Sequence, residues 1–129
     1  MKITIGSVFA GFAAVLLIAA CGGVNVRAQD GVFSDARQLV QRVQSDLHHS
    51  VHHGARNDKE HDRVEAAVKH LSDFDRNLSQ NKFEKDRLNE AIDDVKNVVE
   101  NNTLEADDRD ALTADLGDLR HLRESRGNM

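Results

Sequence analysis

Residues 57–80 have the sequence NDKEHDRVEAAVKHLSDFDRNLSQ, and this stretch decides the fold class. Its apolar residues recur at intervals of three and four, so they would form one stripe along a helix. That stripe consists of Val64, Ala67, Val68, Leu71, Phe74 and Leu78. Asn57, with Glu60 three residues later, resembles a capping box at the start of such a helix. The stretch therefore predicts an amphipathic helix rather than a strand.

Three further segments repeat this spacing, at residues 34–53, 84–101 and 106–125. The chain contains no proline that would interrupt them. The connections between the four segments are only a few residues long, and short connections place consecutive helices antiparallel. We therefore expect an all-α protein that folds as an antiparallel up-down-up-down four-helix bundle.

This bundle would occupy residues 33–126 as a single helical domain, because about 100 residues suffice for one hydrophobic core. Ser34 is a suitable N-cap for the first helix, and Gly54 is a natural stop for it. Gly117 lies inside the last predicted helix, where glycine costs about 1 kcal/mol relative to alanine. We expect that cost to be tolerable if a neighbouring helix approaches closely at Gly117.

The N-terminal residues have the pattern of an export signal. Residues 1–20 carry one charge, at Lys2, ahead of an apolar run, and Cys21 follows the sequence Leu-Ile-Ala-Ala. This arrangement predicts a lipoprotein signal peptide with Cys21 as the lipidation site; cleavage after Ala28 is the alternative. Residues 21–32 would form a flexible tether. Either cleavage predicts an exported bacterial protein, in the periplasm or anchored on the periplasmic side of a membrane.

The charge and the cysteine content exclude several classes of function. The formal net charge is −5, and basic residues are scattered rather than clustered, which argues against nucleic acid or an anionic membrane surface as the main partner. Contact with a membrane would then depend on a lipid at Cys21. Because this is the one cysteine, no intrachain disulfide can form, and packing alone must hold the fold.

A group of histidines is the densest chemical feature of the sequence. It comprises His48, His49, His52, His53 and His61. Histidines four residues apart lie on one helix face, where two imidazoles can bind one Zn, Cu or Ni ion. Such a surface site would exchange its metal readily. The alternative interpretation is structural, because histidine near a helix C-terminus interacts favourably with the helix dipole.

Other cofactor and catalytic patterns fail at decisive positions. Asp73, Asp75, Asn77 and Glu84 have the oxygen spacing of a calcium-binding hand, but Leu78 stands where that loop needs glycine. There is no Cys-x-x-Cys-His motif for haem attachment. No nucleophile motif is present, so we expect no enzymatic activity.

We expect an interaction or structural module of the bacterial envelope with an unidentified protein partner. The second hypothesis is a periplasmic metal buffer or sensor that uses the histidine group. The third is a chaperone-like binder, which would need exposed rows of leucine or phenylalanine.

Overall fold

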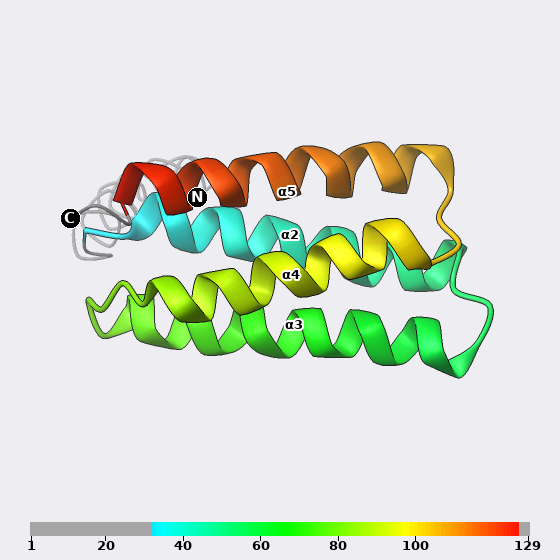
Figure 1. The fold of residues 1–129 in the computed structure, drawn as a ribbon, viewed down its shortest axis with the longest axis horizontal. Helices are drawn as coiled ribbons and strands as arrows, with labels where there is room; N and C mark the ends of the chain where they lie inside the picture. Colours follow the sequence, from blue (N-terminus) through cyan, green and yellow to red (C-terminus); the bar gives the residue numbers. More distant parts are fainter. Residues whose placement is uncertain (1–31, 127–129) are drawn as a thin grey trace, which may run out of the picture. The chain divides into compact units, whose positions relative to one another are not determined.

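The computed structural model describes residues 32–126, and within them it contains four helices and no strand (Figure 1). The helices are α2 (Ser34–His53), α3 (Asp58–Ser79), α4 (Lys85–Asn101) and α5 (Ala106–Arg126). The prediction of an all-helical bundle is confirmed. The predicted signal peptide, Cys21, the alternative cleavage after Ala28 and the tether up to residue 31 lie outside the described residues.

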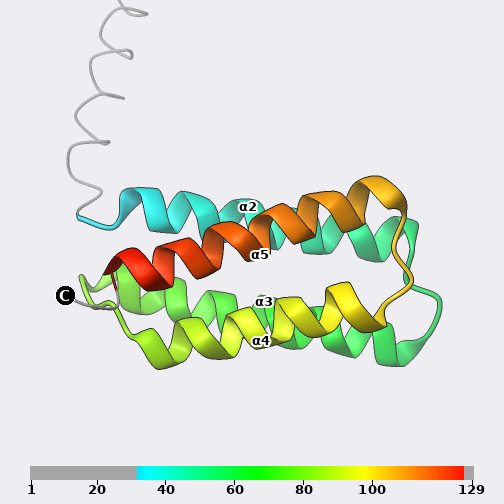
Figure 2. The same cartoon turned by 45° about the horizontal axis from the view of Figure 1, so that its top comes forward.

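The four helices lie side by side along their lengths, and α4 packs closely against both α3 and α5 (Figures 1 and 2). Each helix buries one apolar stripe, as the three-and-four spacing predicts. The largest fully buried apolar side chains are Val40, Val43, Leu47, Leu71, Phe74, Leu78, Leu88, Val95, Val98, Leu112 and Leu119. No helix within residues 32–126 is both long and apolar enough to span a membrane.

Glu60 ties two connections together at one end of the bundle. Asn57 caps α3 as expected, because its side chain accepts a hydrogen bond from the backbone N–H of Glu60. The Glu60 carboxylate does not return to the cap residue, however. One oxygen accepts from the backbone N–H of Arg56 at 2.5 Å, and the other accepts from the backbone N–H of Thr103 at 2.7 Å. The α2–α3 and α4–α5 connections are therefore joined through one buried side chain.

Two glycines have opposite surroundings. A Cβ atom added to Gly54 would lie 2.5 Å from the carbonyl oxygen of Thr103, so this glycine permits close contact between the same two connections. Gly117 has no neighbouring atom within 4 Å of such a Cβ atom. The close approach that would make Gly117 tolerable is therefore not observed, because this face of α5 is exposed to solvent.

Candidate metal centre

The facing sides of α2 and α5 carry a row of polar side chains, which we call the α2–α5 seam. The seam comprises Arg42, Asp46, His49 and His53 of α2 with Asp108, Asp115 and Asp118 of α5. The α2 residues are three or four positions apart and so share one helix face. With neutral histidines, the seam sets one arginine against four carboxylates. This excess of negative charge attracts cations.

His49, His53 and Asp108 come together at one end of the seam. Nδ1 of His49 lies 2.7 Å from a carboxylate oxygen of Asp108, and the two imidazole rings have centroids 4.1 Å apart. One potential ligand atom from each of the three residues lies within 4.8 Å of the other two. A modest side-chain adjustment could therefore place all three around a single metal ion.

Asp108 is the unusual member of this group. Its side chain is only 7% exposed, and its second carboxylate oxygen has no hydrogen-bond partner. A buried carboxylate oxygen without a partner is costly, and a cation would compensate it. Two imidazoles and one carboxylate suit zinc, and also copper or nickel. Because both histidines are exposed, an ion there would have access to water and to exchange.

The structure separates the predicted histidines, four of which lie on α2 and one, His61, on α3. His48 and His61 line a separate cavity of about 270 Å³ between α2 and α3, and Val64 also lines this cavity. His52 is exposed and lines neither that cavity nor the site with Asp108. Of the five predicted ligands, the structure therefore brings two into one potential coordination sphere.

Asp108 was missing from the sequence-based set of ligands. The pair Asp107-Asp108 has the form of ordinary acidic charge in the first turn of a helix, which the helix dipole favours. A signal was nevertheless present, because Asp108 lies four residues before the core residue Leu112 and so belongs to the buried stripe of α5. An acidic residue in an apolar stripe indicates a buried polar contact.

Asp115 occupies the other half of the seam. Arg42 donates hydrogen bonds to Asp115 at 2.9 Å and to Asp118 at 2.6 Å. Asp115 is 2% exposed, and one of its carboxylate oxygens has no donor. Burial, reinforced by the neighbouring carboxyl group of Asp46 and opposed by Arg42, raises the pKa of Asp115 to about 6.

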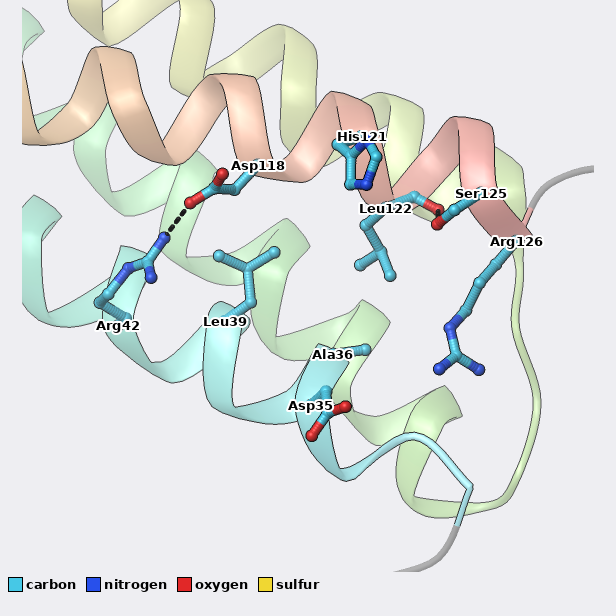
Figure 3. Close-up of a pocket in the computed structure, with 9 residues that line it drawn as sticks. All are labelled: Asp35, Ala36, Leu39, Arg42, Asp118, His121, Leu122, Ser125 and Arg126. Atoms are coloured by element: carbon cyan, nitrogen blue, oxygen red, sulfur yellow. Dashed lines mark hydrogen bonds and ion pairs between the residues drawn. The ribbon is translucent and has the colours of Figure 1, made fainter.

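A groove of about 400 Å³ lies beside the seam, between the start of α2 and the end of α5 (Figure 3). Leu39 and Leu122 contribute apolar surface to it. Charged side chains stand at its two ends, with the Arg42–Asp118 pair at one and Asp35 and Arg126 at the other. The groove has the mixed lining typical of a polar ligand site or protein contact.

Comparison with protein-family models, curated proteins and solved structures gives no match.

Proposed function

We propose that this chain is an exported bacterial envelope protein that binds a divalent transition metal at His49, His53 and Asp108. The observation that carries the proposal is the convergence of two exposed imidazoles on a buried aspartate that has an unpartnered oxygen. Three protein ligands leave coordination positions open to water or to an incoming ligand. The site would therefore act as an exchangeable store or sensor of zinc, copper or nickel.

The charge of the seam supports this proposal. Arg42 is its single permanent cation, and its hydrogen bonds go to Asp115 and Asp118, which leaves Asp108 without an arginine partner. Bringing a divalent ion to Asp108 would reduce the net negative charge between α2 and α5. The metal would also connect these two helices, because it would take ligands from both.

We propose the up-down-up-down arrangement as the finer description of the bundle. Its support comes from side-chain contacts between helices. Along each pair of helices, the residue number on one helix falls as the residue number of its contact on the other rises, as antiparallel helices require. These contacts are Arg42 with Asp118 and His49 with Asp108 between α2 and α5, and Arg63 with Asn102 and His70 with Asp94 between α3 and α4. Spin labels at residues 42 and 118 would then lie closer together than labels at residues 42 and 108.

Export and lipid anchoring are proposed from the N-terminal pattern. Cys21 would be the acylated first residue after removal of residues 1–20. Mass spectrometry of the mature N-terminus tests this directly. An acylated Cys21 supports the anchor, and a free Gln29 supports cleavage after Ala28 and a periplasmic protein without a lipid. An N-terminus that retains Met1 contradicts both forms of the proposal.

Calorimetric titration of the processed protein with Zn²⁺, Cu²⁺ and Ni²⁺ tests the metal site. We expect saturable binding of one ion, and we expect the double variant H49A/H53A to bind at least about tenfold more weakly, because first-sphere ligands are lost. The matched control is H48A/H61A, which removes one histidine from α2 and one from α3, both of them on the separate cavity.

The control variant distinguishes metal binding at His49, His53 and Asp108 from nonspecific metal binding by surface histidines. Retention of affinity in H48A/H61A, with loss in H49A/H53A and in Asp108→Asn, supports the proposed ligand set. Equal loss in both double variants contradicts it. Absence of binding to the unaltered protein contradicts metal binding altogether.

A role as an interaction module is the second candidate, and the groove between α2 and α5 favours it. A photo-crosslinking residue placed at Leu122, on the groove, would then capture a specific envelope protein in living cells. The same residue placed at Asn97, an exposed position on α4, is the control. Equal capture at both positions, or none at Leu122, contradicts the groove as the contact surface.

We do not propose the chaperone-like function. Within residues 32–126, Val32 is the one large apolar residue that is strongly exposed, at 72%. The described surface therefore lacks the rows of exposed leucine or phenylalanine that such a binder would use.

A further inference from the structure

We infer that Asp115 is a proton switch for the metal site, so that metal binding releases a proton from Asp115 and acidification promotes metal release. This inference rests on the proposed metal-binding function. It concerns a group that is not itself a ligand. Metal and proton would occupy different places in the same seam.

The surroundings of Asp115 favour a bound proton. One carboxylate oxygen accepts a hydrogen bond from Arg42, and the other is buried without a donor. The carboxyl group of Asp46 lies within hydrogen-bonding reach of Asp115. Asp46 is half-buried and Asp115 is buried, and a carboxylate in such a position cannot remain ionised beside another at low cost. If Asp115 is protonated, its O–H group can donate a hydrogen bond to the Asp46 carboxylate. This would remove the repulsion and give the unpartnered oxygen a hydrogen bond.

The charged groups around Asp115 come from two helices. Arg42 and Asp46 face it from α2, and Asp118 on α5 shares Arg42 with it. On α4, the Asn89 side chain and the Val99 carbonyl accept hydrogen bonds from α5, and neither titrates. With a pKa of about 6, Asp115 gains and loses its proton at mildly acidic pH.

Asp115 and the metal ligand Asp108 are seven residues apart on α5, which is two helical turns and about 10 Å along the axis. They share the α2–α5 seam, where partial burial limits screening by water. A divalent ion at one end would stabilise the ionised form of Asp115 at the other, and the released proton would pass to solvent. By thermodynamic reciprocity, ionisation of Asp115 strengthens metal binding by the same factor.

Proton release on zinc binding tests this linkage. The processed protein is titrated with Zn²⁺ at pH 6 in buffers of different ionisation enthalpy, which reports the number of protons released per ion. If zinc lowers the pKa of Asp115 by about one unit, the unaltered protein releases about 0.4 proton more than Asp115→Asn, because the group changes from half protonated to about one-tenth protonated.

Asp46→Asn is the second variant, because it removes the repelling carboxylate and leaves Asp115 in place. We expect it to release fewer protons than the unaltered protein at pH 6. A carbon-13 NMR titration of the Asp115 carboxyl group, with and without Zn²⁺, measures the same shift in a protein that carries no substitution. A lower Asp115 pKa in the zinc-bound form supports the switch.

The outcomes separate this inference from the proposed function. If Asp115→Asn binds zinc and releases as many protons as the unaltered protein, or if zinc leaves the NMR titration of Asp115 unchanged, the switch is overturned and the metal site stands. If the unaltered protein does not bind zinc, both proposals fail.

Discussion

Asp108 and Asp115 are buried carboxylates on α5, and each has one oxygen without a partner. Native proteins pair nearly all buried polar atoms, so two such atoms on one helix face require a physical cause. A metal ion beside Asp108 and a proton on Asp115 would each supply the missing partner.

Alanine substitutions at Gly54 and Gly117 should change stability in opposite directions. Gly117→Ala should raise the free energy of unfolding by about 0.5–1 kcal/mol, because alanine favours the helix and its Cβ meets no atom. Gly54→Ala should lower it by about 1–3 kcal/mol, because the Cβ would collide with the backbone at Thr103. Urea denaturation measures both changes. A destabilised Gly117→Ala or a neutral Gly54→Ala would contradict these local environments.

At the scale of elements, the helices are joined by polar contacts at their ends as well as by the apolar core. Asn102, which follows α4, donates a hydrogen bond from its side chain to the Glu60 carbonyl. The Glu60 carboxylate accepts bonds from Arg56 and Thr103, in the connections next to His53 and Asp108. This network holds the end of α2 beside the start of α5, where the proposed metal ligands lie.

The buried carboxyl groups of Glu60 and Asp115 should change stability with pH in opposite directions. Hydrogen bonds from the backbone of Arg56 and Thr103 hold the pKa of Glu60 below its ordinary value. A lowered carboxyl pKa stabilises the fold above the unfolded-state pKa, and this contribution is lost as pH falls through the folded-state pKa. Glu60→Gln should therefore lower Tm at pH 7 and reduce the loss of stability on acidification. The exposed Glu124→Gln is the control.

The contribution of Asp115 to stability depends on pH in the opposite direction to that of Glu60. The pKa of Asp115 is raised to about 6, so the folded state binds its proton more tightly than the unfolded state does. This contribution to stability is present at low pH and is lost as pH rises through about 6. Asp115→Asn should therefore flatten the decline of Tm between pH 5 and 7 in metal-free buffer, as measured by circular dichroism. A decline as steep as that of the unaltered protein would show that Asp115 is already ionised.

Within the whole molecule, a metal that takes ligands from both α2 and α5 would connect the first and the last of the described helices. At a free zinc concentration of 100 times Kd, binding to the folded state alone adds about 2.7 kcal/mol to its stability. For a domain of this size, we expect Tm to rise by roughly 10 °C or more.

Calorimetric melting of the processed protein with Zn²⁺ and with a chelator checks this shift. H48A/H61A should show the full increase, and H49A/H53A should show little or none. A similar rise in both variants would place zinc elsewhere on the molecule.

The sequence alone determined the helical class and the apolar face of each helix, because the three-and-four spacing in stretches such as 57–80 depends only on local helix geometry. It also identified the histidine group, but as one cluster. Tertiary structure decided which histidines meet. His49 lies 59 residues before Asp108, and their contact depends on how α5 is placed and rotated against α2. Periodicity shows which residues of a helix point inward, but packing alone decides which side chain from another helix lies opposite them.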